Sequence, residues 1–336
     1  MEPNVACAPL SPAVFETDCA AEAERIGRHL RASLAGMHKR GVVVGLSGGV
    51  DSSVCAALAV RALGAGKVLG LLMPEQDSSA ASADLGAQVA AQLGIRCETE
   101  NIAPALAAIG CYRWRDEAIR VLFPAYGDSW KNKIVIADGA AGKVHFFELV
   151  VQSPDGEVQR ARLALREYLQ IVAATNYKQR IRKTVEYFHA DRLNYAVLGT
   201  PNRLEYDQGF FVKNGDGSAD IKPIAHLYKT QVYALAHHLG LPDAVCTAPP
   251  TTDTYSLPQG QDEFYFALPY AQMDLALWAH NHQRPAADLA QALGLSEEQA
   301  GSIYADIEAK RRGTRYLHMR PQLVEDALDT ASLERP

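Results

Sequence analysis

The sequence predicts an α/β protein built on a doubly wound, Rossmann-like parallel sheet with an inserted antiparallel β-meander. Three observations carry this prediction. Short, continuous apolar runs alternate with helical patterns through the first third of the chain, and a glycine- and serine-rich turn follows the first of these runs. In the middle of the chain, runs separated by Asp-Gly pairs replace that alternation. Alternating strands and helices are typical of parallel sheets covered on both faces, whereas Asp-Gly pairs favour antiparallel hairpins.

The first hundred residues supply the elements of the parallel sheet. Residues 1–13 show no periodicity and are expected to form a loose tail, whereas apolar residues recur about every four positions from Asp18 to Met37, as in an amphipathic helix. Gly94 stands where the C-cap of a helix is expected. The further elements expected here are strands at 41–46, 67–73 and 95–99 and helices at 54–63 and 82–93.

Residues from about 112 to 166 follow a different pattern. Two apolar-rich runs and one alternating run are separated by Asp-Gly turns, which is the pattern of an antiparallel meander. Because the helical pattern returns from Arg166, we expect one domain, at 14–330, that carries this stretch as an insertion. The three runs are 132–137, 143–152 and 157–163, and the turns begin at Asp138 and Asp155.

The part of the chain after the insertion is predicted to be mostly helical. A long helical pattern begins at Arg166, and the apolar run at 194–200 predicts one more strand. Neither an internal repeat nor a low-complexity linker divides this region. The later helices are expected at 230–239, 264–279, 286–293 and 296–310.

Composition and charge exclude several classes of protein. An apolar content of 48% and a net charge of −6 argue against disorder and against a global attraction to nucleic acid or to an anionic membrane. The six cysteines are scattered without a CxxC pair, which argues against a structural zinc site or a disulfide scaffold. The N-terminus lacks the pattern of a signal peptide, and no apolar run is long enough to cross a membrane. We therefore expect a soluble, cytoplasmic protein.

The strongest local signal lies between the first buried strand and the Ala-rich helix. The glycines of this turn let the backbone approach a phosphate, the helix N-terminus attracts an anion, and Asp51 can hold a Mg²⁺ that bridges phosphate oxygens. The chain has neither a Walker A sequence nor the GxGxxG spacing of dinucleotide-binding folds. The alternative to a phosphate-binding loop is an ordinary strand-to-helix turn, in which serine caps the helix and glycine only allows the backbone conformation of the turn. The turn, SGGVDSS, comprises Ser47, Gly48, Gly49, Val50, Asp51, Ser52 and Ser53.

This heptapeptide resembles the pyrophosphate loop of the N-type ATP pyrophosphatases. That superfamily includes ammonia-using NAD synthetases, GMP synthetases, asparagine synthetases and tRNA thiolation enzymes. The resemblance implies that the loop binds the β- and γ-phosphates of ATP, which leave as pyrophosphate when a substrate oxygen attacks the α-phosphorus. It identifies adenylation chemistry and leaves the acceptor open.

Downstream motifs narrow the resemblance to the ammonia-dependent NAD synthetases, over about 20–100 and 166–280. Three features depart from that family's pattern: the long central meander, Asp77, and Gln179, which stands where a small residue is usual. These departures bear on which carboxylate is amidated more than on whether the protein adenylates its substrate. The motifs, in the family's order, are MPEQDSS at 73–79, NYKQRIR at 176–182, GTPNRLE at 199–205, GFFVKNGDGSAD at 209–220, LYKTQVY at 227–233, PTTD at 250–253 and QDE at 261–263.

The resemblance implies a role for several residues of these motifs. Asp51 and Glu205, the latter expected at a strand end, would hold Mg²⁺, and Lys229 would neutralise charge on the reacting phosphate; these three form the expected catalytic set. The alternative is that these residues have no role in a site. Glu205 would then be an ordinary exposed glutamate, Lys229 a solvated lysine and Arg180 part of a helix surface. Further ATP contacts would come from Arg180, Thr200 and Thr251. The second substrate would be bound by Asn176, Lys213, Asp216 and Asp220.

These roles predict a ligase that uses ATP and Mg²⁺ to amidate a carboxylate with ammonia through an acyl adenylate. In the family, the carboxylate belongs to nicotinic acid adenine dinucleotide. An enzyme that amidates another carboxylic acid in specialised metabolism is one alternative, and a non-catalytic nucleotide-binding regulator is another. The resemblance also implies a homodimer. Because no cysteine lies in a recognisable amidohydrolase context, ammonia is expected to come free or from a separate glutaminase.

Overall fold

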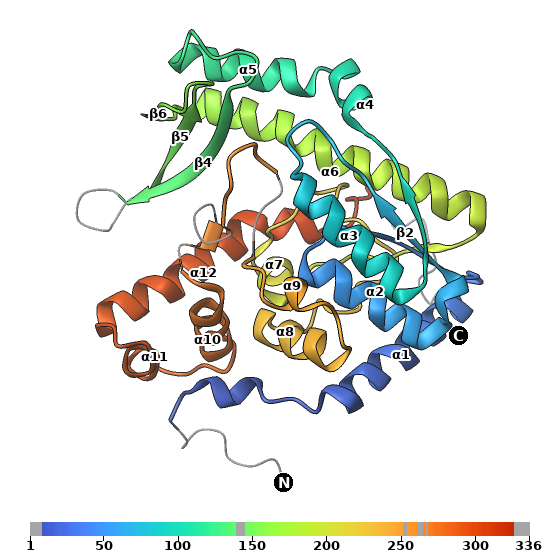
Figure 1. Ribbon diagram of the computed structural model, residues 1–336. Coiled ribbons are helices and arrows are strands. Elements are labelled where there is room, and N and C mark those ends of the chain that lie inside the picture. Colours follow the sequence, from blue (N-terminus) through green and yellow to red (C-terminus); the bar gives the residue numbers. More distant parts are fainter. Residues whose placement is uncertain (1–8, 139–144, 251–253, 261–264, 267, 326–336) are drawn as a thin grey trace.

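Two separate sheets organise the protein in a computed structural model that describes residues 9–138, 145–250, 254–260, 265–266 and 268–325 (Figure 1). One sheet has four parallel strands in the order β3-β2-β1-β7, and the other has three antiparallel strands in the order β4-β5-β6. The predicted α/β class with an inserted meander is therefore confirmed. The strands are β1 (Val42–Gly45), β2 (Val68–Leu72), β3 (Arg96–Thr99), β4 (Lys131–Asp138), β5 (His145–Gln152), β6 (Val158–Arg162) and β7 (Ala196–Val197).

Helices make up most of the remaining described chain. Among them, none combines the length and the apolar composition that a membrane crossing requires. The α-helices are α1 (Cys19–Gly36), α2 (Val50–Leu63), α3 (Ala80–Leu93), α4 (Ala103–Ala108), α5 (Cys111–Leu122), α6 (Leu165–Leu193), α7 (Arg203–Gln208), α8 (Lys229–His238), α9 (Asp243–Cys246), α10 (Tyr270–Asn281), α11 (Ala286–Leu293) and α12 (Glu297–His318).

Strands β1, β2 and β7 of the parallel sheet are buried on both faces, as their continuous apolar runs predict, whereas the edge strand β3 is partly exposed. Successive side chains of a strand point to opposite faces, so Val42 and Val44 of β1 pack into the cluster formed with α1, α2 and α8. Val43 of the same strand packs on the other face, together with Leu69 of β2 and Ala190 of α6. Helices therefore cover both faces, which is the doubly wound arrangement.

The antiparallel sheet packs against α5 and the first half of α6. Its β4–β5 pairing runs from Lys131 opposite Gln152 to Asp138 opposite His145, and the connection between these strands lies outside the described residues. The predicted turn at Asp155 is confirmed: Ser153 N–H donates to the Glu157 carbonyl at 2.9 Å. An apolar cluster joins the sheet to the helices through Ile134, Leu149 and Val151 of the sheet, Ile119 of α5 and Ile171 of α6.

Helix α5 occupies the start of the stretch in which a meander was predicted, from 112. Its buried positions are Cys111, Arg115, Ala118 and Ile119, which have helical spacing. Arg115 interrupts the apolar stripe, and its burial is possible because its guanidinium lies 2.5 Å from an oxygen of Asp77. A helix whose buried face contains a paired arginine hides the periodicity on which sequence prediction depends.

The C-terminal helices α10, α11 and α12 form a separate apolar cluster, to which the N-terminal segment adds Leu10 and Phe15. The chain is therefore packed from Leu10 onward, within the stretch expected to be a loose tail. Two helix boundaries also differ from expectation: α10 begins at Tyr270 after Pro269, rather than at 264, and α12 continues beyond 310 to His318. Proline fixes the backbone where a helix starts, which favours the later beginning of α10.

Candidate active site

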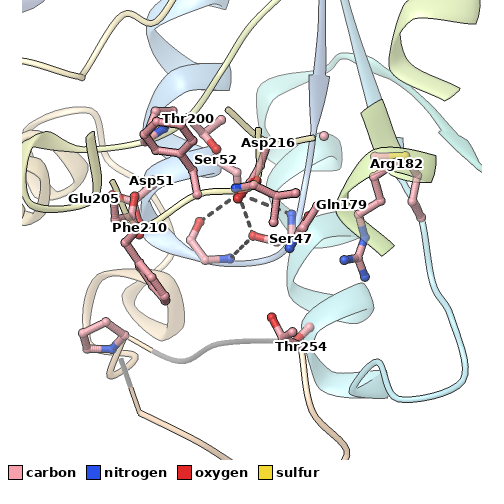
Figure 2. A pocket seen from close by; sticks show the side chains of 18 of the residues that line it. Ser47, Asp51, Ser52, Gln179, Arg182, Thr200, Glu205, Phe210, Asp216 and Thr254 are labelled. Carbon is pink, nitrogen blue, oxygen red and sulfur yellow. Dashed lines mark hydrogen bonds between the residues drawn. The ribbon is translucent and has the colours of Figure 1, made fainter. Parts of the chain in front are cut away.

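A cavity of about 590 Å³ opens at the carboxyl ends of the parallel strands and continues along α6 (Figure 2). The segments that follow β1, β2 and β7 contribute Ser47, Met73 and Thr200 to its lining. Open parallel sheets bind their ligands at this edge, and the volume is within the usual range of small-molecule sites. The strongest motif of the sequence therefore lies in the wall of this cavity.

The SGGVDSS loop is held in shape by its own serines and by α3. Gly48 has a φ of 77°, and a Cβ there would lie 2.4 Å from the Ser82 carbonyl oxygen, so only glycine fits. The hydroxyl of Ser52 donates to the Gly49 carbonyl at 3.1 Å and lies 3.2 Å from that of Ser47, as Figure 2 shows. Hydrogen bonds within the loop and packing against α3 thus set its shape.

The loop leads directly into the first turn of α2. Gly49 is the N-cap residue, and it has no side chain with which to satisfy the N–H groups of that turn. Val50, Asp51 and Ser52 of the turn line the cavity. Helix N-termini of this kind attract phosphate through their N–H groups and the helix dipole. The geometry is that of a phosphate-binding loop with a carboxylate one residue into the helix.

Asp51 and Lys229 form an ion pair at the wall of the cavity. The ammonium of Lys229, which is only 2% exposed, contacts Oδ2 of Asp51. Asn202 donates its side-chain amide to Oδ1 of Asp51 at 3.2 Å, and its backbone N–H to Oε2 of Glu205 at 3.1 Å. Burial alone would lower the pKa of Lys229, but the charges of Asp51 and Glu205 outweigh it and raise that pKa. The lysine therefore remains positively charged inside the site.

Helices α7 and α8 position Glu205 and Lys229. Glu205 lies in the first turn of α7, where it forms a capping box with Asn202, so the expectation of a strand-end position was wrong. Lys229 is the first residue of α8, and Asp274 of α10 caps that helix by accepting the backbone N–H groups of Lys229 and Thr230 at 3.2 and 2.7 Å. Sequence reasoning missed Asp274, because a cap supplied from 45 residues away leaves no local pattern.

The donor set of Asp51 and Glu205 fits a Mg²⁺ ion. Both carboxylates line the cavity beside the phosphate loop, and both act electrostatically on the same buried groups, Lys229 and Cys55. Mg²⁺ in proteins usually takes one or two carboxylates and completes its shell with phosphate oxygens and water. Figure 2 shows the two carboxylates near the loop that would supply such a phosphate site.

Five further predicted residues line the same cavity. Lys213 is fixed there by donating to the carbonyl of Tyr316 at 2.8 Å, which ties its loop to the end of α12. Asp216 accepts the N–H of Val212 at 2.7 Å within that loop. The five residues are Asn176, Arg180, Thr200, Lys213 and Asp216.

Three predicted residues are not placed in the cavity. Ser53 is fully buried and donates its hydroxyl to the Gly49 carbonyl at 2.8 Å, so it shapes the loop rather than lining the site. Asp220 does not line the cavity either: its carboxylate accepts the N–H of Val197 at 2.7 Å and the hydroxyl of Tyr187 at 3.3 Å. The structure thus brings neither residue into the cavity lining, and their contacts with ATP or the second substrate stay predictions. Thr251 lies outside the described residues.

Sequence reasoning also missed a buried ion pair on α6. Lys183 donates to Oε2 of Glu186 at 2.6 Å, and both side chains line the cavity although each residue is only 6% exposed. Burial raises the pKa of Glu186 even though the charge of Lys183 opposes this shift. Their spacing of three residues on a helix is too common to identify such a pair without knowing which face is buried.

The unusual MPEQDSS segment has a structural explanation. Its carboxylates, Glu75 and Asp77, lie 3.0 and 2.5 Å from the ammonium of Lys178, which is only 1% exposed. Lys178 also donates to the Thr254 carbonyl at 2.8 Å. Because Arg115 pairs with Asp77 as well, this charge cluster joins α5, α6 and the 73–79 turn. Asp77 is thus a buried structural partner rather than a residue of the cavity.

Comparison with known proteins identifies the family. The model of the NAD synthase family matches residues 22–120 and 149–314 and leaves out most of the β4–β5 hairpin. A protein of Rhizobium meliloti named NH(3)-dependent NAD(+) synthetase is 58% identical over 312 residues, which cover 93% of each chain. A protein of the same name from Thermotoga maritima is 37% identical over 239 residues, which are 71% of this chain and 79% of that one.

Solved structures share the fold. The NH3-dependent NAD synthetase of Campylobacter jejuni superposes with a TM-score of 0.62 at 21% identity, covering 92% of this chain and all of that one. The NMN synthetase of Francisella tularensis gives a TM-score of 0.64 at 20% identity and covers 93% of this chain. At such identities these structures support the fold, whereas the family model and the close relatives decide the membership. The chain therefore belongs to the NAD synthase family.

Proposed function

We propose that this protein is an ammonia-dependent NAD synthetase, a ligase that converts nicotinic acid adenine dinucleotide into its carboxamide with ATP and ammonia. The observation that carries the proposal is the Asp51–Lys229 ion pair, which lies with Glu205 beside the SGGVDSS loop in one cavity. Relatives that carry the name of this activity are 58% identical over more than nine-tenths of the chain, which favours this reaction over amidation of another acid.

The reaction has two steps. First, a carboxylate oxygen of the acid attacks the α-phosphorus of ATP, the bond to the bridging oxygen breaks, and pyrophosphate leaves. Ammonia then attacks the acyl carbon of the adenylate, AMP leaves with the electron pair of the acyl–oxygen bond, and one proton is released. No protein nucleophile is required, so catalysis rests on positioning and on stabilising charge.

Different residues of the chain would have different roles in this reaction. The N–H groups of the loop and of the first turn of α2 would bind the phosphates that leave. Lys229, held at the site by Asp51, would neutralise negative charge on the reacting phosphate. Asp51 and Glu205 would hold Mg²⁺, which supplies a Lewis acid for the phosphate oxygens. Arg180, Thr200 and Lys213 line the same space and would contact the two substrates.

Several broader features belong to the same proposal. We infer that residues 14–330 act as one synthetase domain, that the protein works in the cytoplasm, and that two copies form a homodimer. Ammonia would be taken up free or supplied by a separate glutaminase. The intact set of Asp51, Glu205 and Lys229 favours an enzyme over a non-catalytic nucleotide-binding regulator.

Pyrophosphate release tests the reaction directly. The purified full chain is incubated with MgATP, ammonium and a panel of carboxylic acids that includes nicotinic acid adenine dinucleotide. We expect release that depends on both ammonium and this dinucleotide, with NAD as the second product. Turnover of a different acid alone would replace the proposed substrate, and an absence of release with every acid would favour the regulator.

A further inference from the structure

The cavity follows one face of α6 for most of its length. Residues that line it recur every three or four positions along the helix, so they form a single stripe. At 1.5 Å per residue, the stripe from Tyr168 to Glu186 extends over about 27 Å. Figure 2 shows Gln179 and Arg182 among the lining side chains, and the stripe comprises Tyr168, Val172, Thr175, Asn176, Gln179, Arg180, Arg182, Lys183 and Glu186.

The two ends of the stripe have different neighbours. The Glu186 end lies against the β1 segment that leads into the phosphate loop, since a Cβ at Gly45 would be 3.1 Å from Oε1 of Glu186. Arg182, one turn earlier, lies 3.4 Å from the hydroxyl of Ser78 in the turn after β2. The charged half of α6 is therefore next to the place where ATP phosphates would bind. The Tyr168 end lies beside the antiparallel sheet instead (Figure 1).

At that end, Phe147 of β5 stacks on Tyr168 of α6. Their ring centroids are 4.3 Å apart and the rings are inclined by only 15°. Both residues are half-buried and both line the cavity, with Val172 and Tyr255 beside them. We call the pair of Phe147 and Tyr168 the aromatic shelf. It brings two aromatic rings to the wall of the cavity, about 27 Å along the helix from the residue that adjoins the phosphate loop.

The meander fixes the orientation of Phe147. β5 is the central strand of its sheet, and the Phe147 carbonyl accepts the N–H of Leu163 at 2.9 Å. Adjacent side chains of a strand point to opposite faces, so Phe146 points away from the shelf, where the guanidinium of Arg162 lies 4.8 Å from its ring. Two neighbouring phenylalanines thus have different surroundings, and only Phe147 lines the cavity.

We propose that the aromatic shelf binds a planar ring of the acid substrate by stacking, and that the inserted meander thereby contributes to substrate recognition. This inference rests on the proposed function, since it assigns the shelf to the dinucleotide rather than to ATP. The assignment follows from distance: ATP is bound at its phosphates by the loop, whereas the shelf occupies the other end of the α6 stripe. Aromatic rings stack well on the rings of nucleotides.

Kinetics of Phe147→Leu and Phe146→Leu test the shelf. Because Phe147 acts only by binding, we expect Phe147→Leu to raise the KM for nicotinic acid adenine dinucleotide about tenfold. Its KM for ATP and its kcat at saturating dinucleotide should stay within about twofold of wild type. Phe146→Leu removes the same number of atoms from the adjacent position and should leave all three constants unchanged. Phe147→Tyr should restore the wild-type KM, because it keeps the ring.

Three outcomes would overturn the proposal. These are an unchanged KM for the dinucleotide in Phe147→Leu, an equal rise in the KM for ATP, and an equal effect of Phe146→Leu. A wild-type protein that does not amidate the dinucleotide would contradict the proposed function instead, so the two failures are distinguishable. If Phe147→Leu does not fold, Phe147→Trp provides a second measurement. Its added fluorescence should be quenched by the dinucleotide and not by MgATP, and the absence of quenching by the dinucleotide would contradict the shelf.

Discussion

The two ends of the cavity are lined by different kinds of chemical group. At the phosphate end, backbone N–H groups and buried charges such as Lys229 act from a tight loop and from the first turns of short helices. At the other end, two rings lie on a long helix and on the central strand of a sheet. Charge in a buried site interacts strongly with charge that develops during a reaction, whereas stacking contributes modestly and equally before and during it. We therefore expect substitutions at the phosphate end to lower kcat and those at the shelf to raise KM.

The largest expected effect is that of Asp51→Asn. This change removes one carboxylate of the proposed Mg²⁺ pair and the partner of a buried lysine, so kcat should fall by about a thousandfold or more. Steady-state pyrophosphate release measures the loss, and circular dichroism reports whether the fold is kept. Asp84→Asn, at an exposed position of α3, is the matched control and should behave as wild type. Turnover within tenfold of wild type in Asp51→Asn would mean that the metal assignment is wrong.

Lys178→Met tests the charge cluster that lies between the two ends. It would leave Glu75 and Asp77 buried without the ammonium that lies 3.0 and 2.5 Å from them. Breaking a buried ion pair in this way typically costs about 3–5 kcal/mol, so the free energy of unfolding in urea should fall by that amount.

The control for this substitution is Lys131→Met, because Lys131 is exposed on β4. Surface changes of this kind usually alter stability by less than about 0.5 kcal/mol. If Lys178→Met were no more destabilising than Lys131→Met, the cluster would not be a structural link between α5, α6 and the 73–79 turn.

We expect Asp274, at the phosphate end, to have a smaller effect, which concerns the pH dependence of stability. Burial raises the pKa of this carboxyl to about 6, although hydrogen bonds from Thr230 and Lys229 oppose the shift. Between about pH 4 and 6 the folded state therefore binds this proton more tightly than the unfolded chain, so its contribution to stability falls as the pH rises through that window.

Asp274→Asn should remove this dependence. Relative to wild type, the variant should gain up to about 3 kcal/mol in the free energy of unfolding as the pH is raised from 4 to 7. Urea denaturation of both proteins across this range measures the difference, with Asp84→Asn as the reference. A difference that does not change with pH would show that Asp274 titrates as an ordinary carboxyl.

Local sequence was enough for much of the fold and for the phosphate end. The apolar runs predicted β1, β2 and β7, and the Asp-Gly pairs predicted the antiparallel sheet, because these signals depend on a few neighbouring residues. The glycines of the loop were expected for a similar reason, because a residue without a Cβ lets the backbone approach a phosphate. Helix α5 was not recognised, because Arg115 lies on its buried face and its partner, Asp77, is 38 residues away.

By itself, then, the sequence determined the class of fold, the loop and the order of motifs that place the chain in its family. Only the tertiary structure decided that Asp274 caps the helix of Lys229, that Ser53 and Asp220 do not line the cavity, and that Phe147 rather than Phe146 meets Tyr168. The physical reason is the range of the interactions. Turn geometry and periodicity are set within a few residues, whereas a partner in a buried pair is chosen by packing between elements far apart in the chain.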